Sequence, residues 1–206
     1  MESSYPVQFD IDFPDRPLNR LTTAFRIFVA IPILIVIGAL SGGSFPTAGG
    51  QTTRYVAWGG GLLFLPPLLM ILFRQKYPRW WFDWNLNFLR FSNRVTAYLL
   101  LVDDHYPSTD GEQAVHLDFP YPDVSQMNRW LPLIKWLLAI PHYVVLLFLA
   151  IAALVAVIVA WFAILFTGTY PRSLFDFVVG VLRWGNRVTG YAFVLVTDQY
   201  PPFSLR

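Results

Sequence analysis

Two parts of this chain repeat one another, so the structure of one part constrains the structure of the other. Three motifs of the first half recur in the second: Arg90-Phe-Ser-Asn-Arg-Val-Thr-Ala-Tyr98 as Arg183-Trp-Gly-Asn-Arg-Val-Thr-Gly-Tyr191, Asp104-His-Tyr-Pro107 as Asp198-Gln-Tyr-Pro201, and Ala30-Ile-Pro32 as Ala139-Ile-Pro141. A chain with such internal similarity is read as copies of one unit. We therefore divide it into a first repeat, residues 1–110, and a second repeat, residues 111–206.

Long uncharged stretches indicate that the chain meets a membrane. Residues 62–73 and 136–170 contain no Asp, Glu, Lys or Arg, and only 14% of the whole chain is charged. Soluble domains are about 25% charged. Apolar runs of this length are typical of membrane helices. The first six residues, Met1-Glu-Ser-Ser-Tyr-Pro, lack the basic and apolar regions of a cleavable signal peptide.

The apolar segments predict four transmembrane helices, near residues 20–40, 55–74, 129–149 and 151–168. In the first repeat a Gly/Ser/Thr-rich loop at 41–54 separates two segments and forms a hairpin over about 20–74. No polar loop interrupts Trp130 to Thr169. A single helix of that length would measure about 60 Å against a hydrocarbon core of about 30 Å. We therefore expect a tight turn near Leu149–Ala153 and a second hairpin over about 129–168.

The basic residues agree with this four-span topology. It places 14 of the 15 Lys and Arg residues on one side of the membrane and leaves only Arg54 on the other. The positive-inside rule then assigns both termini and residues 74–129 to the cytoplasm, as in a multi-pass protein of the cell inner membrane. An even number of spans in each repeat makes this a parallel repeat.

An amphipathic helix is predicted after each hairpin, at about 78–93 and 171–186. Charged residues interrupt the apolar ones there at helical spacing, which is typical of helices that lie at a membrane interface. We interpret Trp80, Trp81, Trp84 and Trp184 as interfacial anchors. Asp83 and Asp176 are expected to form structural ion pairs, with the Arg four residues earlier or with Arg90 and Arg183. The candidate contacts to lipid headgroups are Arg79, Arg90, Arg94, Arg172, Arg183 and Arg187.

Alternating apolar residues predict short strands around these helices. Val95–Val102 and Val188–Val196 alternate after the amphipathic helices, and Val7–Phe13 and Ala114–Phe119 precede the hairpins. Isolated two-stranded hairpins are marginal in water, so pairing across the repeats is expected. The predicted fold class is thus a membrane all-α protein with a small β-sheet: four transmembrane helices as two parallel-repeat hairpins, each followed by an interfacial amphipathic helix and flanked by short cytoplasmic β-strands.

The most specific string lies in the second repeat. Ile140-Pro-His142, then Trp161-Phe-Ala-Ile-Leu-Phe-Thr-Gly-Thr-Tyr-Pro-Arg172, and the Arg183–Tyr191 motif resemble the prokaryotic membrane proteins grouped as domain-of-unknown-function family 4389. The resemblance is strongest over residues 128–203. The first repeat, over 19–107, departs from the pattern with Ile33 in place of His142 and Ser108 in place of Pro202. The resemblance implies a multi-span membrane protein built from repeated units, without an established activity.

The sequence indicates no reaction. It has no cysteine, and no Ser–His–Asp order, phosphate loop or dinucleotide fingerprint. His105 and His116, with Asp103 and Asp104 nearby, match no ligand spacing, so neither a metal site nor a cofactor is expected. The net charge of +2 does not suggest nucleic acid.

The favoured hypothesis is a non-enzymatic accessory or scaffold protein of the membrane. Its partners are expected to be the lipid bilayer and another membrane protein or a second copy of itself. The first alternative is a protein that binds or handles anionic lipids through the matched pairs Arg90/Arg94 and Arg183/Arg187. The second alternative is a small transporter, although no polar residue in the predicted spans lies mid-membrane to form a substrate site.

Overall fold

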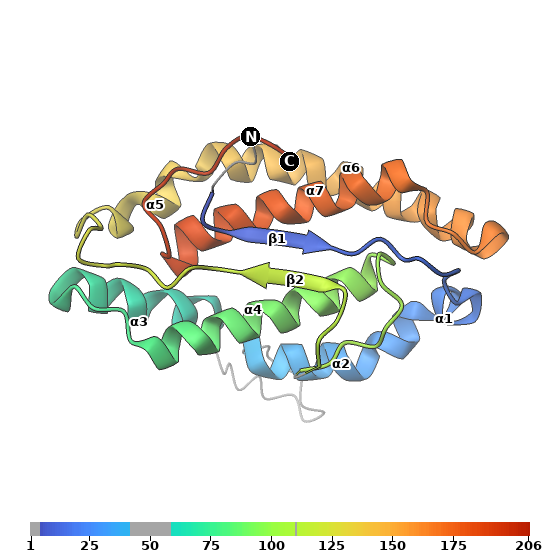
Figure 1. Cartoon of the computed structure of the whole chain (residues 1–206), viewed down its shortest axis with the longest axis horizontal. Coiled ribbons are helices and arrows are strands. Elements are labelled where there is room, and N and C mark those ends of the chain that lie inside the picture. The colour runs from blue at the N-terminus through green and yellow to red at the C-terminus, as the bar shows by residue number, and fades with distance from the viewer. Residues whose placement is uncertain (1–4, 42–58, 110) are drawn as a thin grey trace, which may run out of the picture.

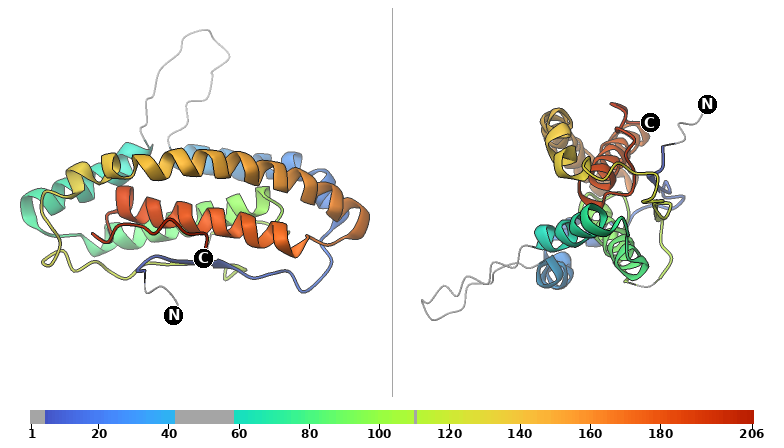
Figure 2. Two further views of the ribbon diagram at one scale, coloured as in Figure 1. Left: turned by 90° about the horizontal axis from the view of Figure 1, so that it is seen from above. Right: turned by 90° about the vertical axis from the view of Figure 1, so that its left-hand side faces the viewer.

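The computed structural model of the protein describes residues 5–41, 59–109 and 111–206, which form three layers (Figures 1 and 2). The middle layer holds two amphipathic helices, and a small sheet lies on one side of it. Apolar helices cover its other side, and the long helices are seen roughly end-on in the right-hand view of Figure 2, so their axes run nearly parallel. The elements are β1 (Gln8–Ile11), α1 (Arg20–Ala24), α2 (Arg26–Ser41), α3 (Gly59–Arg74), α4 (Arg79–Leu99), β2 (Val115–Asp118), α5 (Pro132–Leu138), α6 (Ile140–Thr167), α7 (Arg172–Thr189) and the π-helix η1 (Gly190–Val194).

Helix α6 is continuous over 28 residues, and this corrects the prediction of a second hairpin. The expected turn at Leu149–Ala153 lies inside the helix. From His142 to Thr167 the chain has no Gly, Pro or Asn that would break it. The helix ends at Gly168, whose φ of 81° is the left-handed conformation that glycine adopts freely. The break in this apolar stretch lies instead near its start, between α5 and Pro141 in the first turn of α6.

Four transmembrane spans are not supported. Among the described residues, α6 is the helix long and apolar enough to cross a membrane, whereas α2 and α3 have 16 residues each. The loop of the first predicted hairpin, 41–54, lies almost wholly outside the described residues. Only 22% of the most apolar window of α6 is buried, whereas the core helix of a soluble protein is mostly buried.

The predicted amphipathic helices are present as α4 and α7, and both run further than expected. Val95–Val102 and most of Val188–Val196 are helical or lie in the turn that ends the helix, so these two strand predictions are wrong. Threonine hydroxyls fit these residues into a helix: Thr96 donates to the Ser92 carbonyl at 2.8 Å, and Thr189 donates to the Gly185 carbonyl at 2.9 Å. After each of these helices the chain turns at a leucine with positive φ, Leu101 in the first repeat and Leu195 in the second.

The two strand predictions upstream of the apolar helices are confirmed. In the described part of the chain, β1 and β2 form a two-stranded antiparallel sheet in which Phe9 pairs with Leu117 and Asp10 with His116. One face of each strand is buried and the other is exposed, as the alternation of residue types requires. The sheet therefore joins one strand from each repeat.

Each strand is held by an arginine from the opposite repeat. Arg90 of α4 donates to the Leu117 carbonyl at 2.8 Å, and Arg183 of α7 donates to the Phe9 carbonyl at 2.8 Å. Between α4 and α7, Asn93 and Asn186 donate to one another's side-chain oxygen, at 2.9 and 2.8 Å. Such reciprocal contacts are those of an approximate two-fold relation between the repeats. One hydrophobic core contains residues of both.

The close contact between α7 and the C-terminal segment predicts opposite effects for two glycines of one helix. A Cβ at Gly180 would lie 2.9 Å from the Leu205 carbonyl oxygen, whereas a Cβ at Gly185 would meet nothing within 4 Å. Gly180→Ala should lower the free energy of unfolding by about 1–3 kcal/mol through overpacking. Gly185→Ala should raise it by up to about 1 kcal/mol, since alanine favours the helix. Thermal unfolding of both variants in detergent tests this, and equal effects would contradict the packing of the C-terminal segment.

Candidate functional site

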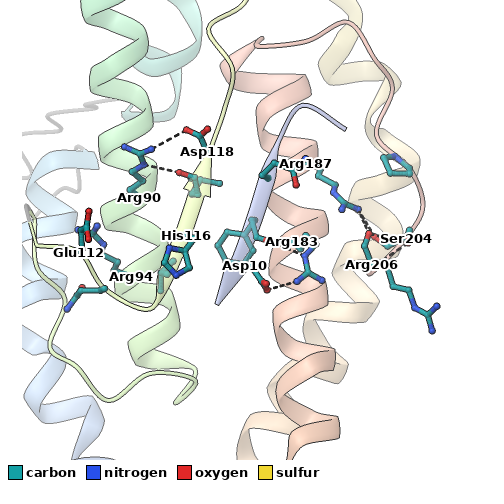
Figure 3. Close-up of a pocket in the computed structure, with 16 residues that line it drawn as sticks. Asp10, Arg90, Arg94, Glu112, His116, Asp118, Arg183, Arg187, Ser204 and Arg206 are labelled. Atoms are coloured by element: carbon teal, nitrogen blue, oxygen red, sulfur yellow. Dashed lines mark hydrogen bonds and ion pairs between the residues drawn. The ribbon is translucent and has the colours of Figure 1, made fainter. Parts of the chain in front are cut away.

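A large concave surface lies over the exposed face of the sheet, on the side away from the apolar helices (Figure 3). It is a groove of about 1400 Å³ bounded by α4 on one side and by α7 with the C-terminal segment on the other. Its charged and polar lining is contributed by both repeats. These residues are Gln8, Asp10, Arg90, Arg94, Glu112, Gln113, His116, Asp118, Arg183, Arg187, Ser204 and Arg206.

Four of the arginines predicted to contact lipid headgroups lie in this groove, where the structure gives them protein acceptors. Besides their strand carbonyls, Arg90 pairs with Asp118 at 3.2 Å and Arg183 with Asp10 at 2.7 Å. Arg94 donates to the Ser108 carbonyl at 2.9 Å, and Arg187 donates to the Arg206 carbonyl at 2.6 Å. In α4, Arg90 thus holds strand β2 and Arg94 holds the loop at Ser108. In α7, Arg183 holds strand β1 and Arg187 holds the C-terminal segment.

Charges of both signs remain accessible in the groove. His116 lies 2.9 Å from Asp12 across the sheet, and both side chains are largely exposed. Glu112 is exposed at the edge of the groove near Arg94 (Figure 3). Arg206 is exposed on the opposite side. The surface is therefore polar and of mixed charge, unlike the apolar layer.

The two predicted acidic ion pairs differ. Arg172 and Asp176 pair at 3.0 Å across one turn of α7, with both side chains more than half exposed, so the pair contributes little to stability. In the described part of the chain, Asp83 has no ion-pair partner. Arg79 lies over the ring of Tyr121 instead, with 5.4 Å between the guanidinium carbon and the ring centroid.

The four predicted tryptophan anchors also divide. Trp80 and Trp84 are exposed, at 68% and 44%, and Trp81 is half-buried against the core. Trp184 is only 5% exposed, and its indole N–H donates to Nδ1 of His142 at 3.0 Å. Trp184 is thus a core residue of the second repeat, where α7 packs against the start of α6.

Each repeat buries a cation that the sequence analysis did not single out. Lys135 is fully buried, 2.7 Å from Asp198, and donates to the Thr197 carbonyl at 2.7 Å. At the matching position Arg26 donates to the Asp103 carbonyl at 2.9 Å and lies over the ring of Tyr98. Burial lowers the pKa of Lys135, and Asp198 partly offsets this. The signal available in the sequence was a charged residue at corresponding positions of two apolar segments.

One acidic cluster has the composition of a metal site. Ligand atoms of Asp103, Asp104 and His105 lie within 4.8 Å of one another. The Arg16 guanidinium already occupies this cluster, 2.7 Å from Asp104 and 3.0 Å from Nε2 of His105. His116 pairs elsewhere, with Asp12. The cluster is therefore explained as a surface ion-pair network that fixes the loop after α4.

Comparison with known proteins adds one match. A family model described as a domain of unknown function (DUF4389) matches residues 130–204, which lie within the second repeat. No curated protein and no solved structure matches the chain. The matched range includes α5, α6, α7 and the C-terminal segment that borders the groove. The comparison assigns no activity to any of these elements.

The buried pair predicts an asymmetric response to substitution. Asp198→Ala should lower the free energy of unfolding by about 3 kcal/mol, because it leaves the Lys135 ammonium buried without a counter-charge. Lys135→Met should cost less, since the Asp198 side chain is 27% exposed and its other oxygen still accepts a hydrogen bond from the Asn128 backbone N–H. Denaturant unfolding in detergent measures both. If Lys135→Met proved the more damaging change, the structure would be wrong about which partner is enclosed.

Proposed function

We propose that the protein is a membrane-anchored accessory or scaffold protein without catalysis of its own. In this proposal the apolar helices hold the bilayer, and the groove over the sheet receives a partner protein. The observation that carries it is the placement of the two surfaces on opposite sides of one molecule. An anchor and an exposed binding surface are the two parts that a scaffold needs.

The apolar side supports the anchoring role. Large hydrophobic side chains are exposed along α1, α2, α5 and α6, including Phe28, Ile35, Phe148, Val155 and Phe166. Contiguous exposed apolar surface marks a contact with membrane or protein. We also infer that the aqueous side is the cytoplasm, because the Lys and Arg residues are concentrated outside the apolar segments.

The polar side supports the binding role. The groove is large, carries both signs of charge and is bordered by Glu112 and Arg206 on opposite walls. Complementary charge of this kind gives specificity toward a polar protein surface. The alternative of anionic-lipid binding is less well supported, since Arg90, Arg94, Arg183 and Arg187 already donate to protein carbonyls.

We further infer that the first repeat is a second copy of the domain matched in the second. Supporting this, α4 and α7 begin after the same Tyr-Pro pair and carry arginines in the same roles, Arg90 as Arg183 and Arg94 as Arg187. The proposed scaffold is then a paired unit within one chain, in which each copy supplies one strand of the binding surface.

Reversal of one charge in the groove should release the partner. Native mass spectrometry of the protein in nanodiscs made from its own membrane should detect a second protein mass. Glu112→Lys should weaken retention of that mass at least about tenfold, the equivalent of about 1.4 kcal/mol, because it reverses a charge at the edge of the groove that the partner's surface would complement.

The matched control is Asp15→Lys, which makes the same change of charge at an exposed residue outside the groove. It should retain the partner. Bound anionic lipid without a second protein would instead favour the lipid-binding alternative. If both variants lost the partner equally, the groove would not be the surface that binds it.

A further inference from the structure

The charged surface and the apolar surface extend along the same direction. The strands run near the middle of the long axis of the molecule, parallel to α4, α6 and α7 (Figures 1 and 2). Along this axis, Asp10, Asp12, His116 and Asp118 are therefore level with the central part of α6 and do not lie beyond its ends. Their side chains are 60–73% exposed. Any orientation of the protein in a membrane has to place these groups in water.

We propose that the protein is monotopic: its apolar helices lie in the plane of one leaflet, and the sheet faces the aqueous phase on that same side. The inference rests on the proposed membrane anchoring and adds its geometry. It assigns the bilayer surface as the occupant of the face formed by α1, α2, α3, α5 and α6. Helix α6 then lies along the membrane and does not cross it.

A crossing orientation conflicts with the arrangement of the layers. If α6 stood upright, α7 and the sheet would stand beside it, and the exposed acids of β1 and β2 would face lipid at mid-bilayer depth. Charged side chains are disfavoured there. The edges of the two-stranded sheet would also enter lipid, where unpaired backbone groups find no water. In the in-plane orientation all of these groups remain hydrated.

The length of α6 fits the same orientation. Its 28 residues extend about 42 Å, longer than the roughly 30 Å hydrocarbon core. The predicted turn rested on the same limit, applied to the longer stretch Trp130–Thr169, but a helix parallel to the surface has no such limit. The buried residues of its middle and C-terminal part form one stripe: Ala153, Ala156, Val157, Ala160 and Ile164. The exposed residues of the helix, among them Phe148, Val155 and Phe166, are free to contact acyl chains.

The edge of the apolar layer carries the groups expected at headgroup depth. Trp80 lies at the start of α4, in the segment that follows α3, and Trp130 lies just before α5. Both rings are exposed, and such rings prefer the interface. Exposed cations lie at the ends of these helices, at Arg20, Arg74 and Arg129. Their charge complements the anionic surface of a membrane. If the apolar surface bound a second copy of the chain instead of a membrane, tryptophans and cations at its edge would not be required.

The depth of two positions on α6 tests the orientation. Val155 and Phe166 are both exposed and lie 11 residues apart, which places them on the same face of the helix. The chain has no cysteine, so Val155→Cys and Phe166→Cys each give a single site for a spin label. Power-saturation measurements in vesicles of phosphatidylethanolamine and phosphatidylglycerol give the depth of each label. We expect the two labels to lie at the same depth in the membrane, to within about 5 Å.

An upright α6 would give a different result, since the two labels would differ in depth by about 16 Å. That result would overturn the in-plane orientation and leave the membrane anchoring intact. Co-flotation of the unlabelled protein with the same vesicles tests the anchoring separately. A protein that stayed in the aqueous fraction as a dimer would overturn both, with a second copy covering the apolar face.

Labelling in cells gives an independent reading. Ser125→Cys precedes α5, Thr169→Cys follows α6, and Asp12→Cys directly follows β1; all three positions are exposed. A membrane-impermeant maleimide is applied to intact spheroplasts and, separately, to inverted vesicles. All three cysteines should react in the same one of these two preparations and remain unlabelled in the other. Reaction of Ser125→Cys and Thr169→Cys from opposite sides would establish that α6 crosses the membrane.

Discussion

The two repeats meet at a buried pair of amides, and the rest of the structure is arranged around it. Asn93 and Asn186 donate to each other's side-chain oxygen between α4 and α7. Each also donates to a carbonyl one turn earlier in its own helix, at Leu89 and Leu182, so the two amides are well satisfied. Buried polar groups are costly when left without partners, and the reciprocal pair therefore favours one alignment of the two helices. That alignment places Arg90 and Arg183 opposite the strands they hold.

From this alignment follows the separation of surfaces on which the proposed function depends. The groove-lining arginines of α4 and α7 reach toward the strands, while apolar side chains of the same helices pack against α2 and α6. The outer faces of the apolar helices then have no protein neighbour among the described residues. They contact only the solvent, membrane or other protein around the molecule. Burying such a face is worth about 25 cal/mol for each Å² removed from water. The size of this face therefore largely determines where the molecule resides.

The parts of the fold that the sequence predicted are those where local pattern and tertiary environment agree. The alternation in Val7–Phe13 and Ala114–Phe119 predicted strands, because each strand has one buried and one exposed face. The arginine spacing predicted α4 and α7. The prediction failed at Val95–Val102, where an apolar run fits either period and the helix continued from upstream.

The second failure had a different physical cause. The turn at Leu149–Ala153 was expected because a bilayer limits the length of a helix that crosses it, and no local sequence signal required it. Of the candidate site, the four arginines of the groove were found from repetition alone, but their acceptors were not. The carbonyls of Phe9 and Leu117 belong to the opposite repeat, and a single sequence does not reveal such an exchange.

The exchange of strands has a consequence for the order in which the chain acquires its structure. The hydrogen bond from Arg183 to Phe9 joins residues 174 positions apart. A ribosome adds about 5–20 residues each second, so β1 waits for seconds before its partners β2 and α7 exist. Contacts this distant in sequence also slow folding, since the loop that they close must be ordered first. The N-terminal strand therefore completes the fold last, although it is synthesised first, and until then its edge is open to other chains.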